Sequence, residues 1–139
     1  MRTSHILSGI LLMGALATGC TRENEVIEPA PRPVGGIGGK STLRITPRHH
    51  LQNINGATVY IKYDTLRATT VFDDSSAVGF IDGRPMAIFD SLAPGNYYLY
   101  ATGLNNDSLV RGGAGFTIID SLETTYDLYL DVLHPGETL

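Results

Sequence analysis

The sequence predicts an all-β protein, with an antiparallel sandwich of about seven short strands in residues 41–139. Three observations support this prediction. From Ser41 onward, apolar and polar residues alternate with a period of two, which is typical of half-buried strands. Turn-forming pairs such as Asp82-Gly83 interrupt the alternation at short intervals. After Cys20, the sequence has no stretch that combines a helical period with capping residues.

Residues 1–19 have the features of a cleaved export signal. Met1 and Arg2 supply a positive start, residues 6–17 form an apolar stretch, and small residues follow. As a helix this stretch is about 18 Å long at 1.5 Å per residue. The hydrocarbon core of a bilayer is about 30 Å thick, so the stretch is too short for a permanent span. We therefore predict a signal peptide.

Cys20 is the only cysteine in the chain, and it follows the signal directly. The residues Ala17-Thr18-Gly19-Cys20 resemble a bacterial lipobox, although alanine is less usual than leucine at its first position. The resemblance implies that a diacylglycerol is attached to Cys20 and that the chain is cut before it. The new amine would then be acylated, and several acyl chains anchor a protein stably to a membrane. The alternative is an ordinary secretory signal with an incidental cysteine.

Residues 20–40 are predicted to be a disordered tether behind the lipidated cysteine. Between Glu23 and Gly39 lie three glutamates, three prolines and four glycines, a composition that buries too little apolar surface to fold. The acidic residues after Cys20 resemble the surface-export signals of some diderm bacteria, and Thr21 stands where aspartate favours inner-membrane retention. These features predict the cell envelope, and there the outer membrane with its face undecided. A plain solvated linker is an equally good interpretation.

The charge of the chain argues against a nucleic-acid partner. The chain has 10 Lys and Arg against 14 Asp and Glu, for a formal net charge of −4. Removal of residues 1–19 takes away Arg2, which leaves 9 basic against 14 acidic residues, or −5. A mildly acidic domain lacks the basic surface that binds a phosphate backbone.

Seven segments of the remaining chain alternate as strands do. They are residues 42–46, 57–63, 78–81, 84–89, 96–102, 115–119 and 125–132. Asp82-Gly83 favours a tight hairpin of type I′, since both central residues need positive φ. Pro94-Gly95 favours a type II turn. Asn55-Gly56 and the segments GLNNDS (103–108) and RGGAG (111–115) are further predicted turns or loops.

The segment AIFDSLAPGNYYLYATG, residues 87–103, resembles the strand–turn–strand unit of transthyretin-like and carboxypeptidase-regulatory-like sandwiches. The matching positions are a phenylalanine, a leucine, Pro-Gly and Tyr-x-Leu, here Phe89, Leu92, Pro94, Gly95, Tyr97 and Leu99. The preceding GATVYIKYDT resembles an early strand of the same domains. The resemblance implies a seven-stranded transthyretin-like (Ig-like) fold, and it carries no activity with it.

Histidines are the first candidate metal ligands. His49 and His50 are adjacent, and neighbours on an extended strand point to opposite faces, so they rarely bind one metal together. His134 is placed to join one of them near the end of the domain, but a site also needs a further ligand and supporting hydrogen bonds. We therefore expect no metal site, with His49, His50 and His134 as weak candidates, and no cofactor.

Acidic loops are the second candidates. Asp64 with Asp73-Asp74, or Asn105-Asn106-Asp107, offers oxygen ligands for calcium. Neither group has the spacing of a known calcium loop, and such residues commonly form turns through local backbone hydrogen bonds. We interpret them as turn formers.

Four tyrosines, Tyr60, Tyr98, Tyr100 and Tyr129, occupy the polar phase of their predicted strands. If these strands share a sheet, the rings form an exposed aromatic face for a protein or carbohydrate partner. The alternative is structural, because cross-strand aromatic pairs stabilise sheets by about 0.2–1 kcal/mol each.

No nucleophile elbow, phosphate loop or zinc-protease motif is present in the sequence, so we predict no enzyme activity. The sequence instead predicts a membrane-anchored lipoprotein that displays one β-sandwich as a binding or structural accessory module. The alternative is a subunit of a fimbria-like surface polymer, although residues 21–40 are too rich in Pro and Gly to serve well as a donor strand. A metal-dependent or hydrolytic enzyme is the third hypothesis.

Overall fold

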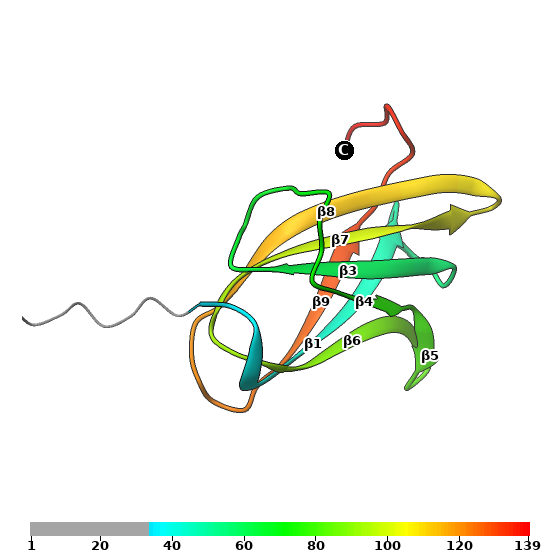
Figure 1. The fold of residues 1–139 in the computed structure, drawn as a ribbon. Helices are drawn as coiled ribbons and strands as arrows, with labels where there is room; N and C mark the ends of the chain where they lie inside the picture. Colours follow the sequence, from blue (N-terminus) through cyan, green and yellow to red (C-terminus); the bar gives the residue numbers. More distant parts are fainter. Residues whose placement is uncertain (1–33) are drawn as a thin grey trace, which may run out of the picture. The chain divides into compact units, whose positions relative to one another are not determined.

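The computed structural model describes residues 34–139, which form nine strands and no helix (Figure 1). In chain order the strands are β1 (Ile37–His49), β2 (Gln52–Asn53), β3 (Ala57–Tyr63), β4 (Asp74–Ala77), β5 (Gly79–Ile81), β6 (Arg84–Leu92), β7 (Gly95–Asn105), β8 (Ser108–Ile118) and β9 (Thr125–Asp131). One sheet has the order β4-β3-β7-β8. The other has the order β2-β1-β6-β5, with β9 also paired to β1. The predicted signal peptide, Cys20 and most of the predicted tether lie outside the described residues.

The core lies between the two sheets, as in a sandwich. Its members come from strands of both: Leu43, Ile45, Phe89 and Leu130 on the five-stranded sheet, and Val59, Ile61, Tyr97, Leu99, Ala101, Val110 and Ile118 on the four-stranded sheet. Most of these side chains are fully buried. The alternation along each strand explains this arrangement, because every second residue points to the same face.

All seven predicted segments lie in or overlap strands, but the count of seven is not confirmed. The additional strands β2 and β4 are short, and the sequence of β4, DSSA, has no apolar alternation to reveal it. The segment RGGAG, predicted as a loop, is instead part of β8. Its glycines allow close approach: a Cβ at Gly112 would collide with the carbonyl oxygen of Asp131, and one at Gly113 with the ring of Tyr98.

The strand pairings are antiparallel, as predicted, with one exception. β1 and β9 run parallel, with Leu43 opposite Tyr126 and Arg48 opposite Asp131. After β8 the chain crosses from one sheet to the other through residues 119–124, and this crossing sets the direction of β9. A parallel pair requires such a crossover, which strand patterns alone do not reveal.

The boundary predicted at residue 40 is also too late. β1 begins at Ile37, and hydrogen bonds to Tyr97 and Ala93 hold Gly36 before that strand starts. Its amide donates to the Tyr97 hydroxyl at 2.8 Å, and its carbonyl accepts from the Ala93 amide at 2.8 Å. Residues 34–40 therefore belong to the folded body rather than to a tether.

Two hairpins place the residues discussed below. Asp82 and Gly83, with φ of 50° and 75°, form the predicted tight turn between β5 and β6. His50 and Leu51, with φ of 46° and 68°, form the turn between β1 and β2. Positive φ is uncommon for residues other than glycine, so the pair His50-Leu51 does not predict this second turn.

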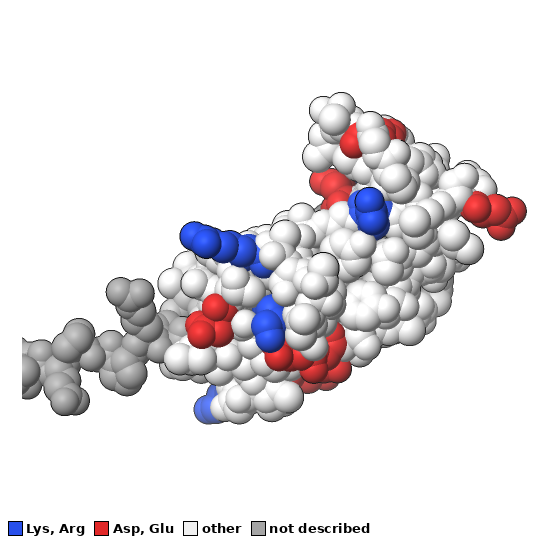
Figure 2. All heavy atoms as spheres, turned by 45° about the horizontal axis from the view of Figure 1, so that its top comes forward, with Lys and Arg blue, Asp and Glu red and all other residues white. Residues whose placement is uncertain are grey.

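Charged side chains lie in small groups of both signs on the face drawn in Figure 2, with uncharged surface between them. Within residues 34–139, no helix has the length and hydropathy of a membrane span.

Candidate functional site

Two of the four candidate tyrosines face each other on the four-stranded sheet. Tyr60 on β3 lies directly opposite Tyr100 on β7, with their ring centroids 6.3 Å apart. Phe72, from the loop between β3 and β4, stacks on Tyr100 at 5.6 Å and 20°, and lies 5.3 Å from Tyr60. We call Tyr60, Phe72 and Tyr100 the aromatic patch. All three rings are half-buried, because the loop folds back over the sheet.

Tyr98 lies on the same outer face, two residues before Tyr100. The hydroxyl end of its side chain lies over Gly113 of β8, where a Cβ would collide with it. Burial raises the pKa of the Tyr98 hydroxyl, and Tyr100 adds a smaller contribution in the same direction. Tyr98 therefore covers the sheet instead of projecting from it.

Tyr129 lies on the other sheet, so the four tyrosines do not form one face. It belongs to β9, which pairs with β1, and it is 51% exposed. The guanidinium groups of Arg48 and Arg84 lie 4.8 Å and 5.7 Å from the centroid of its ring. The prediction that Tyr129 points outward holds, but its surroundings are cationic rather than aromatic.

An open depression of about 430 Å³ lies beside the aromatic patch. It is lined by Tyr60, Phe72, Asp73, Asp74 and Ser75. Asp73 accepts hydrogen bonds from the Tyr63 amide at 2.7 Å and from Lys62 Nζ at 3.0 Å. The bond from Tyr63 is the main reason that the pKa of Asp73 is lowered. Asp73 is thus engaged within the fold, whereas one oxygen of Asp74 accepts only from the neighbouring Ser75 amide at 2.7 Å.

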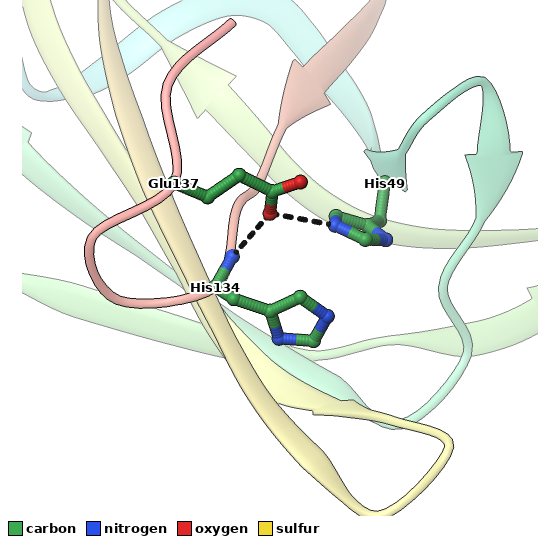
Figure 3. A group of neighbouring side chains, drawn as sticks. All are labelled: His49, His134 and Glu137. Atoms are coloured by element: carbon green, nitrogen blue, oxygen red, sulfur yellow. Dashed lines mark hydrogen bonds and ion pairs between the residues drawn. The ribbon is translucent and has the colours of Figure 1, made fainter.

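The three weak metal candidates converge with a carboxylate. His49 Nε2 lies 3.1 Å from Oε2 of Glu137, and His50 Nε2 lies 2.5 Å from Oε1 of the same side chain. The His134 ring lies 4.6 Å from the His49 ring, and the His134 amide donates to Glu137 Oε2 at 2.9 Å (Figure 3). We call His49, His50, His134 and Glu137 the histidine cluster.

The expectation that His49 and His50 point apart is wrong, for a local reason. β1 ends at His49, and the positive φ of His50 turns the chain, so both rings reach Glu137. Extended geometry would have separated them.

Glu137 was missed by the sequence analysis, because nothing in residues 134–139 distinguishes its carboxylate from a solvated one. In the fold its pKa is lowered to about 2. The largest cause is the hydrogen bond from the His134 amide, followed by those of His49 and His50. Glu137 is therefore a carboxylate throughout the neutral range.

The loop candidates for calcium do not converge in this way. Asp64 has a φ of 60° and is exposed, while the Asp73 carboxylate is bound by its own neighbours. Asn106 and Asp107, with φ of 49° and 62°, form the turn between β7 and β8. Asn105 instead donates through Nδ2 to Nδ1 of His49 at 3.0 Å.

Comparison with known proteins adds no relative to these observations. No protein-family model matches the sequence, and no curated protein is similar to it.

Proposed function

We propose that this protein is a lipid-anchored binding module of the bacterial cell envelope, in the outer membrane, and not an enzyme. In this proposal Cys20 carries the lipid, residues 21–33 span the distance to the folded body, and a transthyretin-like sandwich binds carbohydrate at the aromatic patch. The observation that carries the binding role is the stack of Tyr60, Phe72 and Tyr100 beside the depression that Asp74 helps to line.

The chemistry of the depression favours a sugar over a protein partner. Aromatic rings pack against the apolar C–H face of a sugar ring, while a carboxylate such as Asp74 and a hydroxyl such as Ser75 bond its hydroxyl groups. A depression of about 430 Å³ has the size of a small-ligand site. A stable protein interface buries about 800 Å² on each partner, and the half-buried rings of the patch offer much less than that.

The anchor and the binding site require separate tests. Cells that express the full chain and are fed a labelled fatty acid should label the protein, and Cys20→Ser should abolish the label and release the protein into the aqueous fraction. For binding, the purified full chain is applied to an array of neutral and acidic oligosaccharides. We expect Tyr60→Ser to weaken the retained glycan at least about tenfold, because Tyr60 both lines the depression and supports Phe72.

Tyr129→Ser is the matched control, because it removes an exposed tyrosine from the other sheet. It should leave glycan binding unchanged, and circular dichroism of both variants reports whether the fold is kept. Binding that Tyr60→Ser and Tyr129→Ser affect equally, or an array on which no sugar is retained, would overturn the aromatic patch as the site. Absence of the lipid label would overturn the anchor alone.

A further inference from the structure

The histidine cluster brings nitrogen and oxygen donors together from opposite ends of the folded chain. His49 ends β1, whereas His134 and Glu137 follow β9. One donor atom from each of these three residues lies within 4.8 Å of the other two, and His49 is buried. Ligands that bind one tetrahedral zinc ion at about 2.0–2.1 Å lie roughly 3.4 Å apart. The 3.1 Å between His49 Nε2 and Glu137 Oε2 is already close to that separation.

We propose that His49, His134 and Glu137 form a zinc-binding site, with Nε2 of each histidine and Oε2 of Glu137 as the ligand atoms. Two imidazoles and one carboxylate are a donor set that zinc accepts, with a fourth position left for water. Calcium and magnesium prefer oxygen ligands throughout, so a site with two nitrogen donors favours a transition metal.

The surroundings of His134 orient it as a ligand. Its Nδ1 lies 2.9 Å from the carbonyl oxygen of Leu109, which can only accept a hydrogen bond. Nδ1 therefore carries the proton, and Nε2 keeps its lone pair. Metal-bound histidines usually donate their second ring nitrogen to a carbonyl or carboxylate in this manner.

Asn105 lies beside Nδ1 of His49, as the Leu109 carbonyl lies beside Nδ1 of His134. Its amide lies 3.0 Å from His49 Nδ1, and the nitrogen faces the ring in this structure. A half-turn of the amide presents Oδ1 instead, which accepts a proton from Nδ1 and frees Nε2 for the metal. His49 Nε2 then exchanges its hydrogen bond to Glu137 for a bond to the same ion that Glu137 binds.

Hydrogen bonds that form without any metal hold the Glu137 carboxylate in position. The His134 amide donates to Oε2 at 2.9 Å, and His50 lies 2.5 Å from Oε1. His50 is thus a positioning residue that fixes the second oxygen of the carboxylate. Both oxygens of the carboxylate are therefore positioned by hydrogen bonds before any metal binds.

Without a metal, the same contacts make a hydrogen-bonded clasp between the end of β1 and the C-terminal segment. A clasp and a zinc site predict different results, because only the site responds to the ion. Bound zinc would also stabilise the folded protein, and the stabilisation would grow as the free zinc concentration exceeds the dissociation constant. Copper(II) binds nitrogen sites more tightly than zinc does, so it should compete for the same residues.

Titration of the purified, metal-free full chain with zinc chloride, followed by calorimetry, tests the proposal. We expect one zinc ion per chain and a rise in the thermal midpoint. His134→Gln and Glu137→Gln should each weaken binding more than about 100-fold, and His50→Ala about 10–100-fold, as expected for a positioning residue.

Glu123→Gln is the matched control, since it removes an exposed carboxylate from the segment before β9. It should leave zinc binding unchanged. If a histidine variant fails to fold, imidazole NMR spectra of the unaltered chain decide the case, because zinc should shift the His49 and His134 signals. Zinc binding weaker than about 10 µM, or binding that survives Glu137→Gln, would overturn the proposal and leave only the clasp.

Discussion

The outer faces of the two sheets are built from the same alternation, yet they differ in chemistry. On the four-stranded sheet, Tyr60 and Tyr100 pair and are covered by Phe72. On the five-stranded sheet, ion pairs connect β9 to β1 and to β6, and two of the arginines, Arg48 and Arg84, lie over the ring of Tyr129. These pairs are Arg44–Asp127 at 2.8 Å, Arg48–Asp131 at 2.9 Å and Arg84–Asp127 at 2.7 Å.

The comparison shows that an outward position in a strand does not determine what a side chain does. Half-buried aromatic rings exclude water and stabilise through packing. Exposed ion pairs remain hydrated, so they contribute little to stability and depend on salt. We therefore expect the aromatic face to hold the β3–β4 loop in place, and the charged face to tune solubility and strand register.

The largest expected difference comes from removing one ring on each face. Phe72→Ala should lower the free energy of unfolding by about 2 kcal/mol, which is below the ~3–5 kcal/mol of a fully buried phenylalanine. Tyr129→Ala should cost less than about 1 kcal/mol, the range of an exposed cation–π contact. Urea unfolding of both variants measures the contrast, and equal losses would mean that the loop packs no better than open surface.

A smaller effect is expected where Tyr98 lies over β8. Gly113→Ala should cost about 1–3 kcal/mol, because the new methyl group collides with the Tyr98 ring. Part of this cost should disappear in a Tyr98→Ala background, and a double-mutant cycle measures the coupling. Gly79→Ala is the matched control, since a Cβ at that position meets no neighbouring atom within 4 Å. If the losses in unfolding free energy of Gly113→Ala and Tyr98→Ala were simply additive, the close approach of Tyr98 to Gly113 would be contradicted.

The smallest effect concerns the charges. The hydrogen bond from Arg44 is the main reason that the pKa of Asp127 is lowered. A carboxylate whose pKa is lower in the folded state stabilises above its ordinary pKa and loses that contribution as the pH falls. Asp127→Asn should therefore slightly lower stability at neutral pH, and the stability of the variant should depend less on acid below about pH 4.

Asp73→Asn makes the same change, aspartate to asparagine, beside the four-stranded sheet. Asp73 also has a lowered pKa, but its main partner is the Tyr63 amide rather than a charged side chain. Added salt should reduce the effect of Asp127→Asn more than that of Asp73→Asn, because Lys62 supplies only part of the stabilisation of Asp73. Thermal unfolding at low and high salt measures both, and an identical salt response would remove the distinction.

Local chemistry in the sequence was sufficient for much of the fold. The period-two alternation located seven of the strands, since the pleat requires it whatever the topology. Asp82-Gly83 predicted its hairpin, because few other pairs accept positive φ at both positions. The same reasoning failed for RGGAG, where glycine serves close packing under Tyr98 rather than chain reversal.

The period-two alternation predicts, without any structure, that four tyrosines lie on the outward phase of their strands. The folded chain places Tyr129 on a different sheet from Tyr60 and brings Glu137 to His49, 88 residues away in the sequence, and no local pattern predicts either contact. The physical reason is that side-chain direction follows from local backbone geometry. The partner of a side chain depends instead on strand order, crossover direction and turn conformation, and these are set by the packing of the whole domain.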